Sequence, residues 1–298
     1  MKAVSPRDYY HEADKQALES LKAIPGFDLL LKKFMEIFSE TQQECLNMAS
    51  KVRLGPKQLP EIYNLLPPIC ATLGIEEPQF YLEQNPEFNA YTTGDTKPAI
   101  TLHSALVEAM TEDELRAIIA HECGHIACHH VLYHTLANLI LNVGSGFLGG
   151  LGELISLPLK IAFYRWNRCS ELSADRAAAI CLGGSDIVED AMIRLSAGDK
   201  TVSQNINREE YRKQAENYKD LLDDSLWKKI LVYSTMLDLT HPFTAVRAYE
   251  INNWTKTGQF KKIIEYMNAP DDGKKCPKCG APVNDDWTFC NSCGEKLK

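Results

Sequence analysis

The chain has 298 residues, of which 45% are hydrophobic and 24% are charged, a composition typical of a folded globular protein rather than a disordered or collagen-like one. Its formal net charge of −8 argues against nucleic-acid binding by the chain as a whole, because phosphate binding needs clustered Lys and Arg. The first residues, MKAVSPRDYYHEADKQ, lack the basic and apolar regions of a secretory signal. We therefore expect a cytoplasmic protein whose ten cysteines bind metal or pack in the core rather than form disulfides.

The N-terminal third of the chain predicts helices followed by a small sheet. Apolar residues recur at three- and four-residue intervals from residue 8 to about residue 50, with a break at Pro25-Gly26, and a further helix is expected near residues 59–75. The segments PQFYLEQ, FNAYTTG and PAITLHSALV predict three short strands. Turn residues separate the last two, so we expect a small antiparallel sheet.

A long helix is expected to follow, from Thr111 to about residue 141. Thr111 and Glu114 have the spacing of a capping box, and the apolar pattern continues through TEDELRAIIAHECGHIACHHVLYHTLANLIL. Cys123 points away from the face of the histidines and is expected to pack in the core. The same is expected of five further cysteines: Cys45, Cys70, Cys128, Cys169 and Cys181.

This helix carries an H-E-x-x-H motif, formed by His121, Glu122 and His125. Spacing by four residues places both imidazoles on one face, where their nitrogens can bind zinc at about 2.0–2.1 Å. Glu122 can then act as general base towards a water that the metal activates, which is the chemistry of peptide-bond hydrolysis. The alternative, a helix with two surface histidines, is disfavoured because the motif lies in the apolar stretch RAIIAHECGHIAC.

Three more histidines, His129, His130 and His134, continue this helix. We interpret them as polar positions on a helix flank rather than a second metal site, because no carboxylate or cysteine pattern accompanies them.

The tract of residues 132–166 is strongly apolar but is interrupted by charged and amide side chains and by five glycines between residues 144 and 152. Two interpretations stay open: a buried or lid-like helical hairpin, and a segment that contacts or spans a membrane.

A third ligand is needed, since a catalytic zinc commonly has three protein ligands and an open position. Glu171 and Asp175 lie four residues apart in another predicted helix, SELSADRAA. Glu171 could bind the metal while Asp175 accepts the far N–H of a ligand imidazole. On spacing alone, an exposed acidic helix face explains the pair equally well. Further helices are expected from residue 207 to about 239 and from 242 to 253.

The C-terminal residues form a separate module after the linker NAPDDGKK. Two C-x-x-C pairs, each followed by glycine, can close a tetrahedral zinc site with thiolate ligands at about 2.3 Å. The four ligands are Cys276, Cys279, Cys290 and Cys293. A redox pair is disfavoured because no βαβ pattern surrounds it. We predict a structural zinc ribbon. Two interpretations of its role stay open: docking of a protein partner and binding of nucleic acid, the second being disfavoured by the acidic balance of the chain.

Four motifs in order resemble the zinc endopeptidases of the HtpX and CAAX prenyl protease type, over about residues 60–255. The motifs are Asn89-Ala90-Tyr91 with Thr93-Gly94, the H-E-x-x-H pentapeptide, the pair Glu171 and Asp175, and His241-Pro242 with Arg247. The resemblance implies a gluzincin with Glu171 as third ligand. It implies that Asn89, Ala90, Tyr91, Thr92 and Thr93 lie on an edge strand that pairs with an extended substrate. It also implies that His241 and Arg247 lie near the site, one stabilising the oxyanion or bracing Glu171.

We therefore predict a mainly helical α+β fold with three parts: an N-terminal helical region (1–58), a zincin-like metallopeptidase domain (59–268) and a zinc ribbon (269–298). The predicted function is a zinc endopeptidase acting on peptides or unfolded proteins, with one catalytic and one structural zinc. The alternative is a gated or weakly active, chaperone-like peptide-binding protein that retains the metal site.

Overall fold

The computed structural model describes residues 2–142, 157–223 and 243–269, together with residues 275–280, 283, 288–290 and 293–297 of the C-terminal module. The N-terminal region consists of four helices, α1 (Pro6–Tyr9), α2 (Glu12–Lys22), α3 (Phe27–Ile37) and α4 (Glu40–Ser50). Gly26, with φ of 89°, separates α2 from α3 as expected. Ser39 adds a second break, because its side chain accepts a hydrogen bond from Gln42 N and caps α4.

The sheet has four strands in the order β1-β2-β4-β3. These are β1 (Val52–Arg53), β2 (Gln79–Glu83), β3 (Ala90–Thr93) and β4 (Ala99–His103), with α5 (Pro60–Tyr63) and α6 (Leu66–Leu73) between β1 and β2. The β3–β4 hairpin is antiparallel as expected, but β2 and β4 are parallel, so the sheet is mixed. The reason is that β4 inserts between β2 and β3, which leaves β3 at the edge.

The helix with the H-E-x-x-H motif, α8 (Glu112–Ala127), begins with the predicted capping box after α7 (Ser104–Ala109). The prediction of one continuous helix to residue 141 is wrong, because α9 (Val131–Asn142) is a separate helix. His129 adopts a left-handed φ of 57°, and the N–H groups of His129 and His130 donate to Ile126 O and His125 O. This Schellman-type turn ends α8 and directs His130 into the interior.

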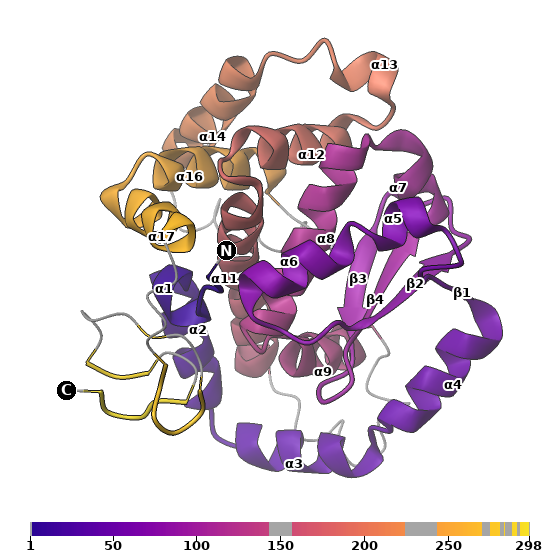
Figure 1. Ribbon diagram of the computed structural model, residues 1–298, viewed down its shortest axis with the longest axis vertical. Coiled ribbons are helices and arrows are strands. Elements are labelled where there is room, and N and C mark those ends of the chain that lie inside the picture. The colour runs from indigo at the N-terminus through magenta and orange to yellow at the C-terminus, as the bar shows by residue number, and fades with distance from the viewer. Residues whose placement is uncertain are drawn as a thin grey trace.

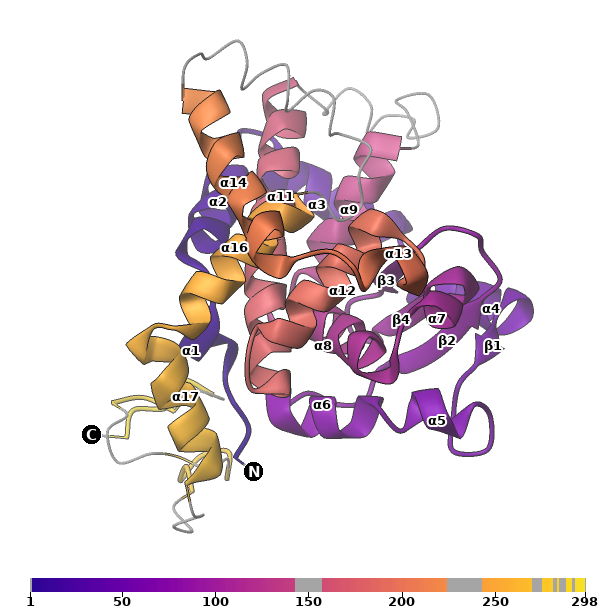
Figure 2. The same ribbon diagram turned by 90° about the horizontal axis from the view of Figure 1, so that it is seen from above.

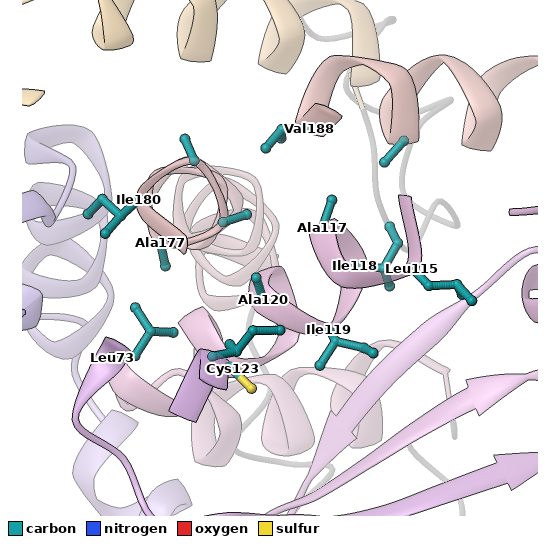
Figure 3. Packing of buried hydrophobic residues seen from close by; sticks show 14 of the residues in the cluster. Leu73, Leu115, Ala117, Ile118, Ile119, Ala120, Cys123, Ala177, Ile180 and Val188 are labelled. Atoms are coloured by element: carbon teal, nitrogen blue, oxygen red, sulfur yellow. The ribbon is translucent and has the colours of Figure 1, made fainter. Parts of the chain in front are cut away.

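Helix α8 packs closely against α11 (Leu157–Leu182), which carries Glu171 and Asp175. A Cβ atom at Gly124 would lie only 2.8 Å from Ala177 Cβ and 2.9 Å from Ala174 Cα, so only glycine allows this approach. Figure 3 shows the small side chains of Ala120 and Ala177 within the same packed cluster. Small residues thus bring the two motif-bearing helices together.

The remaining described helices are α12 (Asp186–Ala197), α13 (Lys200–Ser203), α14 (Arg208–Asp223), α16 (Thr244–Thr255) and α17 (Gly258–Asn268). The sheet lies on one side of α8, and α16 and α17 lie on the other, beyond α11 (Figure 1). Figure 2 shows the same arrangement from above. The predicted fold class, mainly helical α+β with a small sheet and a cysteine-rich C-terminal module, is confirmed.

Two flanks of the apolar tract are described: α9 and the first turns of α11. Leu136 and Phe163 are buried there against Phe27 of α3, in a second hydrophobic cluster. Within the described residues, no helix combines the length and apolar character needed to cross a bilayer. The centre of the tract, residues 143–156, lies outside the described residues, so the choice between hairpin and membrane contact stays a prediction.

The cysteine predictions have mixed outcomes. The core prediction is correct for Cys70, Cys123 and Cys128, which are buried, whereas Cys169 and Cys181 are half-buried. It is wrong for Cys45, which is exposed because it lies on the outer face of the peripheral helix α4.

Candidate active site and metal centres

Three metal-binding side chains converge in the core. His121 Nε2 and His125 Nε2 on α8 lie 3.1 Å apart, and the Glu171 carboxylate of α11 lies 3.4 and 3.3 Å from them. A tetrahedral zinc with ligands at about 2.0–2.1 Å has donor separations of about 3.3–3.4 Å. All three side chains are buried, and their spacing fits one such ion.

Asp175 and Arg247 contact two of the three side chains of this cluster. Asp175 Oδ1 lies 2.9 Å from His121 Nδ1 and also accepts a hydrogen bond of 2.6 Å from Arg247 Nη2. The other oxygen, Asp175 Oδ2, accepts a hydrogen bond of 2.8 Å from Arg247 Nε. Arg247 Nη1 also forms an ion pair of 2.8 Å with Glu171 Oε2. The guanidinium of α16 therefore connects both carboxylates of α11.

The pocket shifts the pKa values of the two imidazoles in opposite directions. Burial alone would lower the pKa of His121, but hydrogen bonds and charge from Asp175 and Glu171 raise this pKa to about 9. Burial would raise the pKa of Asp175, but the charge and hydrogen bonds of Arg247 hold it below its ordinary value. Burial lowers the pKa of His125. The carboxylates of Glu171 and Asp175 and the guanidinium of Arg247 together carry a net negative charge, which favours a cation beside the imidazoles.

Glu122 lies on α8 beside the edge strand. Thr92 Oγ1 of β3 donates a hydrogen bond of 2.6 Å to Glu122 Oε2. The other oxygen, Oε1, is buried and has no hydrogen-bond partner among the described residues. One oxygen of the carboxylate is thus held by Thr92, and the second has no hydrogen-bond partner among the described residues.

The strand predicted to bind substrate alternates its side chains between two faces. Tyr91 points away from Glu122. Its hydroxyl donates a hydrogen bond of 2.8 Å to Glu83 Oε2 and accepts one of 2.7 Å from Lys51 Nζ. Asn89 precedes the strand and is buried, and its carbonyl accepts from His103 N. Ala90 is also buried, and Thr93 is half-buried at the end of the strand.

A cavity of about 20 Å³ lies beside these groups. His121 and Glu122 line it together with apolar side chains, among them Leu106, Ile118 and Met192. The walls of this small space are therefore mainly apolar.

The structure brings together every predicted residue of the core site that it describes, including Arg247. His241 lies outside the described residues. The sequence did not reveal the partner of His125. His130, which was interpreted as a polar position on a helix flank, is fully buried, and its Nδ1 lies 3.0 Å from Nδ1 of His125. The turn after α8 produces this contact, and no residue spacing indicates it.

The four C-terminal cysteines also cluster. Cys276 and Cys293 sulfurs lie 3.7 Å apart, and those of Cys279 and Cys290 lie 3.6 Å apart. Thiolates at about 2.3 Å from a tetrahedral zinc are about 3.8 Å apart, so the cluster fits one ion with all four positions filled. After each pair, Gly280 and Gly294 adopt φ of 73°, and their N–H groups donate to Cys276 O and Cys290 O.

Comparisons with known proteins agree with both clusters. The model of peptidase family M48 matches residues 56–255, and that of a zinc-ribbon domain matches residues 275–297. The plastoglobule-localized metallopeptidase 48 of Arabidopsis thaliana, a chloroplastic protein, is 32% identical over 270 residues, which cover 90% of this chain and 78% of that protein.

One bacterial and one archaeal relative match over shorter regions. A protease HtpX homolog of Bacteroides fragilis is 29% identical over 43% of this chain and 39% of its own length. Protease HtpX homolog 2 of Methanosarcina acetivorans is 23% identical over 53% of this chain and 62% of its own length. The chain therefore spans less than two thirds of these HtpX homologs. No solved structure gives a significant match.

Proposed function

The chain belongs to peptidase family M48, and we propose that it is an endopeptidase in which His121, His125 and Glu171 bind zinc and Glu122 is the general base. Family membership supports zinc-dependent proteolysis, and a protease acts on peptides or proteins. The observation that supports the residue assignment is the cluster of three donors, whose separations of 3.1–3.4 Å fit the ligands of a tetrahedral ion. The carboxylate of Glu122 accepts a hydrogen bond from Thr92 through one of its oxygens.

Zinc bound at this cluster would lower the pKa of a water towards neutrality and polarise the carbonyl of the scissile bond. Glu122 Oε1, which has no hydrogen-bond partner among the described residues, would accept the proton of the attacking water. The same carboxyl group would then donate this proton to the leaving amine. Thr92 would hold Oε2 and so keep Oε1 directed into the site.

Asp175 and Arg247 would act by orienting the ligands. Asp175 Oδ1 would accept the Nδ1 proton of His121, which leaves the Nε2 lone pair for the metal. The contacts of Arg247 with Asp175 and Glu171 support its role in bracing Glu171 rather than in binding the oxyanion. The oxyanion role stays a prediction for His241.

We further propose that an extended substrate binds along β3, from Asn89 to Thr93, by main-chain pairing. The hydroxyl of Tyr91 is engaged by Lys51 and Glu83, so this residue would contribute through its backbone. The four C-terminal cysteines would hold a second, structural zinc. The division at residues 58/59 and 268/269, the cytoplasmic location, membrane contact and docking of a protein by the ribbon stay predictions.

The test is Glu122→Gln in the full-length chain, with hydrolysis of casein and of a peptide library as the readout. Since a general base contributes about 10²–10⁴-fold, we expect a loss of that size with zinc content unchanged. Glu108→Gln, which changes an exposed carboxylate on α7, is the matched control and should leave hydrolysis unchanged. A wild-type chain that binds library peptides but cleaves none of them, with or without a zinc chelator, would favour the chaperone-like alternative.

A further inference from the structure

The second metal-binding imidazole, His125, is in contact with a buried chain of polar groups that ends on the N-terminal helix α2. His125 Nδ1 lies 3.0 Å from His130 Nδ1, and His130 Nε2 lies 3.0 Å from Asp14 Oδ2. His130 and Asp14 are both 0% exposed. Asp14 lies outside residues 56–255, the region that matches the peptidase family.

The positions of the hydrogens follow from the geometry. If His125 Nε2 offers its lone pair to a metal, its Nδ1 carries the hydrogen and donates it to His130 Nδ1. His130 must then carry its own hydrogen on Nε2, which faces the carboxylate of Asp14. The opposite arrangement would put the His125 lone pair on Nδ1 and its hydrogen on the metal side. A carboxylate at the end of the chain therefore selects the tautomer of His125 that can bind metal.

Asp14 is itself held in place by helix α11. Ser173 Oγ donates a hydrogen bond of 2.6 Å to Asp14 Oδ2 and accepts one of 3.0 Å from His11 N at the start of α2. Ser173 lies between Glu171 and Asp175 in the sequence. The hydroxyl of Tyr10 lies 3.1 Å from His130 Nε2. A buried carboxylate without such partners would be strongly destabilising, so these contacts define where Asp14 lies.

The same residues raise a second possibility, because His125, His130 and His134 are close enough to share a metal ion. That ion would need a lone pair on His125 Nδ1, and the core site needs one on His125 Nε2. A neutral imidazole has only one such nitrogen. His134 Nε2 lies instead 3.0 Å from Ser170 Oγ. The contacts thus favour a hydrogen-bonded relay over a second metal site.

We propose that His130 and Asp14 are positioning residues for His125, and that α2 is therefore part of the metal site. The two imidazoles would be oriented in parallel ways: His121 directly by Asp175 of α11, and His125 through His130 by Asp14 of α2. This inference rests on the proposed function, because it assumes that His125 binds zinc through Nε2.

The experiment compares the zinc affinity of the core site in full-length chains carrying Asp14→Asn, His130→Phe or His130→Gln, by competition with a chromophoric chelator. The visible spectrum of the cobalt-substituted chains is a second readout. Loss of a partner behind a ligand imidazole commonly weakens metal binding about 10–100-fold. We expect a loss of this size in Asp14→Asn and His130→Phe, with an altered cobalt spectrum, and a smaller loss in His130→Gln, whose amide oxygen can still accept a hydrogen bond.

Glu12→Gln, which changes an exposed carboxylate on the same helix, is the matched control and should leave both readouts unchanged. Wild-type zinc affinity and cobalt spectrum in folded Asp14→Asn and His130→Phe chains would overturn the relay. So would an extra zinc equivalent in the wild type that only His130→Phe removes. A Glu171→Gln chain that binds as much zinc as the wild type would overturn the proposed function itself, and the relay with it.

Discussion

The core cluster and the C-terminal cysteine cluster both fit a tetrahedral metal, yet they are assembled differently. In the core, His121 and its partner Asp175 are 54 positions apart and meet because α8 packs on α11. In the C-terminal module, Cys276 and Cys293 are only 17 positions apart, and the turns at Gly280 and Gly294 bring the sulfurs together.

The number of donors and the groups around them decide what a metal does in each cluster. In the proposed core site, three donors would leave a position open for a reactant, and Glu122, held by Thr92, would supply a carboxylate there. Four thiolates leave no open position, and so short a segment has too little core to fold without metal. Variants in each cluster can test whether the two sites are independent.

The largest effect is expected for Glu171→Gln. Removing the third ligand should abolish zinc binding in the core, and with it several kcal/mol of transition-state stabilisation, which corresponds to a rate loss on the order of a thousandfold or more. Hydrolysis and zinc per chain are the measurements. Zinc should fall from two equivalents to one, and retention of both equivalents would contradict the ligand assignment.

A smaller loss is expected for Asp175→Asn. The amide cannot serve as the anionic acceptor for His121 and leaves Arg247 with a weaker partner, so zinc affinity of the core site should fall about 10–100-fold. Chelator competition measures it. Asp113→Asn, an exposed position on α8, is the control. An unchanged affinity would mean that Asp175 supports the fold but not the ligand.

Thr92→Val tests whether the core site depends on an oriented base, which the cysteine cluster does not need. Hydrogen bonds to charged groups contribute about 1.5 kcal/mol or more, so the turnover rate should fall about tenfold with zinc content unchanged. Thr92→Ser retains the hydroxyl and should restore most of the rate. Equal rates in the two variants would show that the hydroxyl does not position Glu122.

The smallest effect on hydrolysis is expected for Cys290→Ser. The C-terminal module should lose its zinc, so total zinc should fall by one equivalent. Cleavage of a short peptide should stay within about twofold, because the core donors and the four cysteines form separate groups. Cys45→Ser, at an exposed thiol outside both clusters, is the control. A large loss of peptide cleavage would show that the two sites are coupled.

Local patterns in the sequence were sufficient to predict several features of this protein. The capping box at Thr111, the helical spacing of His121 and His125, and the paired cysteines each depend on residues a few positions apart, so backbone geometry alone relates their side chains. The resemblance to a peptidase family extended these local patterns to Glu171 and Arg247.

Only the tertiary structure decided which distant groups meet. The left-handed turn at His129 ends α8 early and buries His130, and packing of α2 on α11 brings Asp14 to it. The insertion of β4 beside β2 makes that pair parallel and leaves Thr92 on the edge strand, next to Glu122. These contacts depend on how helices and strands pack over the whole chain, and periodicity reports only which face of an element is buried.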